Sequence, residues 1–200
     1  GFANLRVINE DWVAPGTGFG MHGHRDMEII TVVLQGELSH KDSLGHGETI
    51  RPGEVQRMSA GRGILHSEFN HSVRDTTHLL QIWIQPHTIG ASSGYAQKPF
   101  AAEERDGRFQ LVVSPDGRDG SLSMQADAAL YLGHFDGEQQ AEFKLDARRR
   151  AYVHVALGRV SVNGVTLEAG DALKVENEAA LHFAQGDQAE VLLFDLAPAN

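Results

Sequence analysis

Short apolar runs separated by turn-forming residues are the feature that most constrains the fold of this 200-residue chain. The runs are rich in Val, Ile, Leu and Phe and are bounded by Gly, Pro, Asn and Asp, which is typical of β-strands. Helical periodicity is nearly absent, and the best helix candidate is Leu122–Leu130, beginning at Ser121. The sequence therefore predicts an all-β protein with few short helices. We expect strands at Glu28–Leu34, His78–Ile84, Arg108–Val113, Ala151–Leu157, Arg159–Val162, Val165–Leu167 and Val191–Asp195.

Composition limits the classes of partner. A hydrophobic content of 41% is enough for one large core or two small ones. The formal charge of -10 argues against binding to nucleic acid or to an anionic membrane, because both need clustered Lys and Arg. No apolar stretch approaches the roughly 20 residues of a membrane helix, and no signal peptide is visible. We therefore expect a cytoplasmic protein with neither nucleic acid nor membrane as a partner.

The chain contains no cysteine, which restricts its metal chemistry. Neither a disulfide framework nor a thiolate zinc site can form. Any metal ion must be held by His, Asp or Glu.

A change of composition divides the chain near its middle. The segment 86–104 contains Gly90-Ala-Ser-Ser-Gly94, two prolines and few large apolar residues, which is typical of a linker. We predict an N-terminal domain over residues 1–100 and a C-terminal domain over residues 101–200.

The two halves share a weak internal repeat, which indicates two related all-β units. In the second half, Asn163-Gly164 lies between two apolar strands and predicts a tight hairpin, since both turn residues need positive φ. The similar segments are Val33–Ser39 followed by Ile50–Val55, and Val155–Ser161 followed by Leu167–Ala172.

Two pairs of polar residues have the spacing of metal ligands on strands. Residues i and i+2 of a strand point to the same face, so His22 and His24 can converge, and so can His66 and Glu68. If these stretches lie on neighbouring strands, three imidazoles and one carboxylate meet. That set suits divalent iron, manganese, nickel, copper or zinc and leaves positions open for water, O2 or substrate.

Most histidines in proteins are not metal ligands, and the alternative for any single one is a surface or hydrogen-bonded role. His46, His71, His87 and His134 lie in polar, loop-like surroundings and receive no functional assignment. Two same-face pairs, each flanked by glycines, favour a metal site over coincidence, although one His-x-His alone is weak evidence.

These residues match the motifs of a known family. Gly16, five residues, His22-x-His24, three residues, Glu28 and then Gly36 resembles the first cupin motif, and Gly53 through His66 resembles the second. More narrowly, the chain resembles the pirin family, including its bacterial quercetin 2,3-dioxygenase members, from its first motifs to Ala189–Asp195. The stretches that carry this resemblance are HGHRDMEIITVVLQGELSHKDS, MSAGRGILHSEFN and HLLQIWIQP.

The resemblance implies a bicupin of two double-stranded β-helix (jelly-roll) barrels, the first holding one divalent transition metal. The implied ligands are His22, His24, His66 and Glu68. The expected metal is Fe2+, with Mn, Ni, Cu, Co or Zn as alternatives. Glu28 occupies the glutamate position of the general cupin motif. In pirin-like proteins, however, the fourth ligand is the glutamate of His-Ser-Glu, so Glu28 is left a structural or supporting role.

Departures from the general cupin pattern are themselves pirin-like. Seven residues rather than six separate Glu28 from Gly36, and Ser59 stands where the general second motif has proline. The usual N-terminal segment of the family is missing before Gly1, so we expect a piece of that kind to have been removed.

The second half lacks the equivalent ligand pair. Counting back from Gly158 by the spacing of the first half reaches Lys144 and Asp146, and an ammonium group is not a ligand at neutral pH. His182 falls near the place of His66, but one imidazole makes no site. We expect the C-terminal barrel to be a scaffold without metal.

The family chemistry implies a dioxygenase that cleaves the ring of a flavonol such as quercetin with O2 and releases CO. Glu68, loosened from the ion, would act as general base. Phe19, Met21 and Phe69 are candidates for an apolar mouth, with plain core packing as the alternative.

His40 and Gln81 are candidates for hydrogen bonds to the ligands, with an ordinary polar role on a strand as the alternative.

Two other functions of the protein remain open. One is a redox-sensing or regulatory pirin that acts through a protein partner, which the acidic charge and lack of a nuclear targeting run disfavour. The other is a cupin acting on a different enol or small aromatic. The resemblance also implies a monomer.

Overall fold

The computed structural model describes residues 1–198 and confirms the predicted all-β class. Two short 3-10 helices, Ala102–Arg105 and Arg118–Gly120, are the helices of this part of the chain. The chain forms two compact units. The first comprises Gly1, Leu5–Phe100 and Leu122–Ala126; the second comprises Phe2–Asn4, Ala101–Ser121 and the residues from Asp127 onward.

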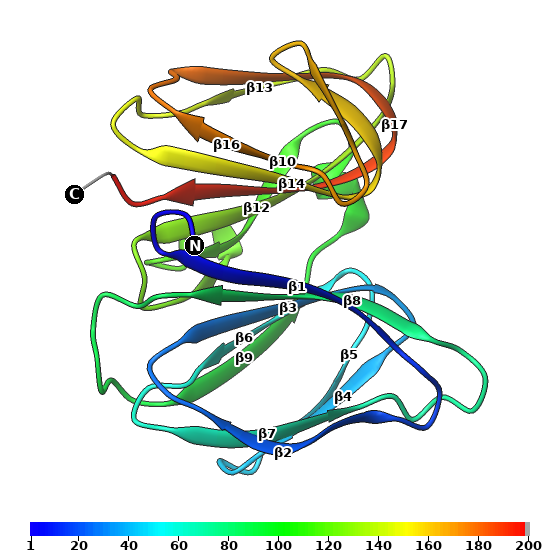
Figure 1. Ribbon diagram of the computed structural model, residues 1–200, viewed down its shortest axis with the longest axis vertical. Coiled ribbons are helices and arrows are strands. Elements are labelled where there is room, and N and C mark those ends of the chain that lie inside the picture. Colours follow the sequence, from blue (N-terminus) through cyan, green and yellow to red (C-terminus); the bar gives the residue numbers. More distant parts are fainter. Residues whose placement is uncertain (199–200) are drawn as a thin grey trace. The chain divides into compact units, whose positions relative to one another are not determined.

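The first unit is built from two antiparallel sheets (Figure 1). The five-stranded sheet has the order β1-β8-β3-β6-β9 and the four-stranded sheet the order β2-β7-β4-β5. Apolar side chains from both sheets pack together, as Val33 of β3 does with Leu38 of β4, so the core lies between them. The strands are β1 (Leu5–Val13), β2 (Gly18–His24), β3 (Glu28–Gln35), β4 (Leu38–Asp42), β5 (Gly47–Ile50), β6 (Glu54–Ser59), β7 (Ile64–Phe69), β8 (Thr77–Ile84) and β9 (Gly94–Pro99).

The second unit is built from one curved antiparallel sheet with the order β10-β12-β17-β14-β15; β13 also pairs with β17, and β16 with β14. Its core is aromatic and aliphatic and includes Phe135, Val153 and Phe183. The strands are β10 (Phe109–Ser114), β12 (Ala128–Gly137), β13 (Ala141–Lys144), β14 (Arg150–Val162), β15 (Val165–Glu168), β16 (Ala172–Glu176) and β17 (Ala180–Leu196). The remaining strand, β11 (Leu122–Ser123), belongs to the first unit.

The predicted helix over Leu122–Leu130 is wrong. This stretch contains β11 and the beginning of β12. Leu122, Met124 and Ala126 are buried while the residues between them are exposed or half-buried, so burial repeats every two residues, as in a strand. The same period is present in the sequence, where Leu122, Met124 and Ala126 alternate with polar residues, but the high helix propensity of Leu, Met and Ala favoured the helix interpretation.

The predicted hairpin and internal repeat are both present. Asn163 and Gly164 have φ values of 47° and 79° and join β14 to β15, with Val162 paired to Val165. The repeated glycines adopt matching left-handed conformations: Gly36 and Gly158 have φ values of 76° and 70°, and Gly53 and Gly170 have values of 86° and 91°.

Substitution of Gly158 should destabilise the protein far more than substitution of Gly170, the other repeated glycine of the second half. A Cβ at Gly158 would overlap the backbone at Asp187 and Gln188, whereas a Cβ at Gly170 has open space. We expect Gly158→Ala to lower the free energy of unfolding by about 3 kcal/mol or more, and Gly170→Ala by about 1–2 kcal/mol from backbone strain alone. Denaturant titration measures both; equal losses would contradict the packing role of Gly158.

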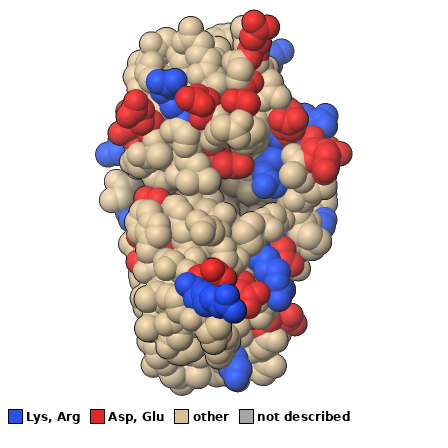
Figure 2. Space-filling model, turned by 90° about the vertical axis from the view of Figure 1, so that its right-hand side faces the viewer, with Lys and Arg blue, Asp and Glu red and all other residues tan. Residues whose placement is uncertain are grey.

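The surface carries charges of both signs. Figure 2 shows basic and acidic side chains interspersed on the face drawn. Within residues 1–198, no helix is long and apolar enough to cross a membrane.

Candidate metal centre

Three histidines converge on the inner side of the four-stranded sheet. β2 and β7 are antiparallel neighbours, and their register places His22 directly opposite His66. The Nε2 atoms of these two rings are 2.9 Å apart, and one donor atom from each of His22, His24 and His66 lies within 4.8 Å of the others. The predicted pairing of two neighbouring strands thus brings the three imidazoles together.

The histidine nitrogens are arranged as a metal ion requires. His22 Nδ1 lies 2.8 Å from the carbonyl oxygen of Gly20 and donates to it, so Nε2 is the nitrogen that faces His66. Nε2 of His24 is buried and has no hydrogen-bond partner among the described residues. Two nitrogens bound to one ion at about 2.1 Å and at right angles lie about 3 Å apart, close to the spacing of His22 and His66. These residues therefore fit a divalent transition metal.

Burial favours the neutral form of two of the three imidazoles, His66 and His24. It lowers the pKa of His66 to about 3, and the nearby His22, His24 and His40 further disfavour a second positive charge. Burial, followed by repulsion from His22, also lowers the pKa of His24. Neutral imidazole is the ligand form, so a metal ion does not have to displace protons from these two rings at neutral pH.

Glu68 lies two residues beyond His66 on the same face of β7 and is buried. The 4.8 Å cluster consists of the three imidazoles and does not include its carboxylate. Gln81 of β8 donates a hydrogen bond of 2.9 Å from Nε2 to Glu68 Oε1. Burial raises the pKa of Glu68, and the nearby carboxylate of Asp11 raises it further, while the bond from Gln81 opposes them.

Trp83 fixes the direction of the Gln81 amide. The indole nitrogen of Trp83 can only donate, and it lies 3.2 Å from Gln81 Oε1. The NH2 group of Gln81 must therefore face Glu68. The same indole packs edge-on against His24, with ring centroids 5.0 Å apart. One tryptophan thus supports both an imidazole and the carboxylate.

Glu28 lies on the other face of β3. Its neighbour Ile29 packs in the cluster that includes Trp83, and successive strand residues point to opposite sides. The Glu28 carboxylate instead accepts a hydrogen bond of 2.8 Å from Ser59 Oγ, to which Arg57 donates at 2.9 Å. Glu28 therefore connects β3 to β6. Of the two roles predicted for it, structural or supporting, this is the structural one.

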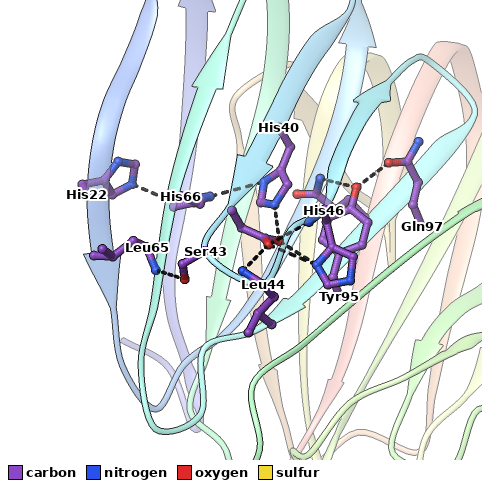
Figure 3. A network of polar contacts seen from close by, with 11 residues as sticks. His22, His40, Ser43, Leu44, His46, Leu65, His66, Tyr95 and Gln97 are labelled. Atoms are coloured by element: carbon purple, nitrogen blue, oxygen red, sulfur yellow. Dashed lines mark hydrogen bonds and ion pairs between the residues drawn. The ribbon is translucent and has the colours of Figure 1, made fainter.

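Both predicted supporting residues make the expected hydrogen bonds. Gln81 contacts Glu68, as described, and His40 Nδ1 lies 3.4 Å from His66 Nδ1 (Figure 3). Beyond His40, the line of contacts continues to Asp42 and then to His46.

The sequence reasoning missed Asp42 and Trp83. Each shares a strand face with a residue that was identified, Asp42 with His40 and Trp83 with Gln81, at the spacing of two that revealed His22 and His24. Applying that spacing test to every polar candidate could have found both.

The three predicted mouth residues lie in different places. Phe19 is the register partner of Glu68 and is 41% exposed, as expected of a residue at the edge of the site. Phe69 is next to Glu68 on β7, so it points to the opposite face, where its ring packs against His71. The prediction that Phe69 lines the mouth is therefore wrong. Met21 is 60% exposed.

The equivalent positions of the second unit are engaged elsewhere. Asp146 is paired with Arg148, whose Nη2 lies 2.6 Å from its Oδ2, and Lys144 ends β13. His182 is on β17, where its Nδ1 lies 3.5 Å from a carboxylate oxygen of Glu142.

Two strand-built units, one with a histidine-lined interior, define a bicupin, and comparison with known proteins narrows this class. The family model for pirin matches residues 2–84, and that for the quercetinase C-terminal cupin domain matches residues 111–196. The quercetin 2,3-dioxygenase of Escherichia coli K12 is 46% identical over 198 residues, which cover 99% of this chain and 84% of the relative. A pirin-like protein of Caulobacter vibrioides is 39% identical and is covered over 83% of its length.

One similar solved structure contains a metal ion. The bacterial pirin YhhW of Escherichia coli, in complex with nickel(II), superposes with a TM-score of 0.93 at 45% identity, over 100% of this chain and 85% of YhhW. The chain belongs to the pirin family.

Proposed function

We propose that this protein is a mononuclear metal-dependent dioxygenase that cleaves a flavonol such as quercetin with O2 and releases CO. The observation that carries the proposal is the convergence of three imidazoles beside a buried carboxylate. Relatives named quercetin 2,3-dioxygenase, and one solved with nickel(II), support it.

The proposed ligands are His22, His24, His66 and Glu68. Three of them already lie close together, while Glu68 would turn from Gln81 toward the ion or share its oxygens between the two. We expect Fe2+ from the family resemblance. Mn, Ni, Cu, Co and Zn are alternatives, because nitrogen and oxygen donors accept all of these ions.

When bound, the metal ion supplies Lewis acidity that lowers the pKa of the flavonol 3-hydroxyl and open positions for substrate and O2. Glu68, loosened from the ion, accepts the hydroxyl proton as general base. Gln81 holds one oxygen of Glu68, and the other oxygen takes the proton once it has loosened from the ion. Phe19 provides apolar surface beside Glu68 for a flat aromatic ring.

The overall reaction balances without another reactant. One flavonol and one O2 yield one CO and an ester product that keeps the remaining oxygens. The proton that Glu68 accepts is returned to that product. No external reductant is needed.

The test is an aerobic assay of apoprotein reloaded with each candidate metal in turn. We expect flavonol absorbance to fall only with metal and O2 present, and to stay constant under argon or with the apoprotein. Metal-loaded protein that leaves flavonols and other enols unchanged would contradict the enzyme proposal. That outcome would favour regulation through a protein partner.

A further inference from the structure

We propose that His40 and Asp42 form a positioning relay that fixes the ring orientation and tautomer of His66 for metal binding. The inference rests on the proposed function, because it takes His66 as a ligand. It adds two residues of β4 to the machinery of the site, neither of which would touch metal or substrate.

The relay is a continuous line of buried contacts (Figure 3). His66 Nδ1 lies 3.4 Å from His40 Nδ1, and His40 Nε2 lies 2.8 Å from Asp42 Oδ2. The side chains of His40 and Asp42 are both fully buried. The sheet sets this arrangement, since β4 is the other neighbour of β7 and its register pairs Asp42 with His66 and His40 with Glu68.

Metal binding fixes the direction of every hydrogen bond in the relay. A neutral imidazole carries one proton, so if His66 offers Nε2 to an ion, its Nδ1 must donate. His40 Nδ1 must then accept, and His40 Nε2 carries the proton that it donates to Asp42. The reverse direction would place a proton on His66 Nε2 and block the ligand atom.

Asp42 is held as a fixed acceptor at the end of this line. Its Oδ1 accepts hydrogen bonds from the backbone N–H groups of Leu44 at 2.9 Å and His46 at 3.2 Å. These bonds keep the carboxylate in place independently of His40. A carboxylate acceptor behind an imidazole favours the tautomer with the proton facing it, so Asp42 sets the state of His40 and, through it, of His66.

His46 provides a matched control. Its ring Nδ1 lies 3.0 Å from Asp42 Oδ2, but its side chain is 39% exposed, whereas that of His40 is fully buried. It is therefore a histidine that contacts the same carboxylate without standing between Asp42 and His66.

The experiment measures Ni2+ affinity by competition titration and the ligand-field absorption of the Co2+ form. We expect His40→Phe to weaken Ni2+ binding about 10- to 100-fold and to shift the Co2+ spectrum. His40→Gln, which can accept from His66 and donate to Asp42, should restore affinity to within about 3-fold of wild type. Asp42→Asn, which reverses the bond to His40, should behave as His40→Phe does, and His46→Gln should match wild type.

The outcomes separate the relay from the site itself. Wild type that fails to bind Ni2+, or His66→Ala that binds it normally, would overturn the proposed ligands and the relay with them. A second outcome would overturn the relay alone. In it, wild type binds Ni2+, His66→Ala does not, and Asp42→Asn keeps the affinity and the Co2+ spectrum of wild type. If His40→Phe does not fold, as judged by circular dichroism of the apoprotein, Asp42→Asn and His40→Gln decide the question.

Discussion

Replacing His66 by alanine is expected to weaken metal binding by well over about 100-fold and to abolish flavonol turnover. The loss should exceed that from changing a residue behind a ligand, which is about 10- to 100-fold, because one of three imidazole donors disappears. His66 is the central ring of the cluster, with His22 on one neighbouring strand and His40 on the other. Metal content by mass spectrometry and the absorbance assay measure both effects.

His182→Ala is the matched control for this variant. His182 is an exposed histidine of the second unit, and its Nδ1 lies 3.5 Å from a carboxylate oxygen of Glu142. Metal content and turnover should match wild type. Full metal content in His66→Ala, or loss of metal in His182→Ala, would contradict the assignment of the site to the first unit.

Replacing Glu68 by glutamine is expected to retain metal, with affinity reduced about tenfold, and to lower turnover by about 10²- to 10⁴-fold, the usual contribution of a general base. The glutamine keeps the shape of the side chain and an oxygen that can accept from Gln81. It removes the negative charge and the ability to take the hydroxyl proton. Single-turnover rates of the metal-loaded variant, with metal content measured on the same sample, separate the two effects.

Glu28→Gln controls for the loss of a buried carboxylate. Glu28 is as deeply buried as Glu68, and burial likewise raises its pKa, but it faces Ser59 on the other side of the five-stranded sheet. We expect unchanged metal content and turnover. Undiminished turnover in Glu68→Gln would remove that residue from the base role, and a loss in Glu28→Gln would instead assign it a part in the site.

Local spacing predicted much of the fold and of the histidine cluster. Asn163-Gly164 specified its hairpin because only positive φ closes a turn of two residues there. The spacing of two placed His22 and His24 on one face, and the same rule applied to His66 and Glu68. Each of these inferences depends on geometry within a few residues of the chain.

The pairing and packing of strands that are distant in the sequence determined the parts of the site that the sequence did not predict. Asp42 reaches His66 only because β4 pairs with β7, and Trp83 reaches His24 only because the two sheets face each other. The stretch Leu122–Leu130 was misjudged for a different reason. Its Leu, Met and Ala residues have high helix propensity, and that was weighed above the alternation of apolar and polar residues that its burial follows.

The most direct measurement of the proposed activity is the stoichiometry of the reaction catalysed by metal-loaded wild type. We expect one O2 consumed and one CO released for each quercetin lost, with CO detected by haemoglobin binding or gas chromatography. The apoprotein and His66→Ala should release none. Quercetin loss without CO, or CO release that is equal in the apoprotein, would show that the histidine cluster does not perform this ring cleavage.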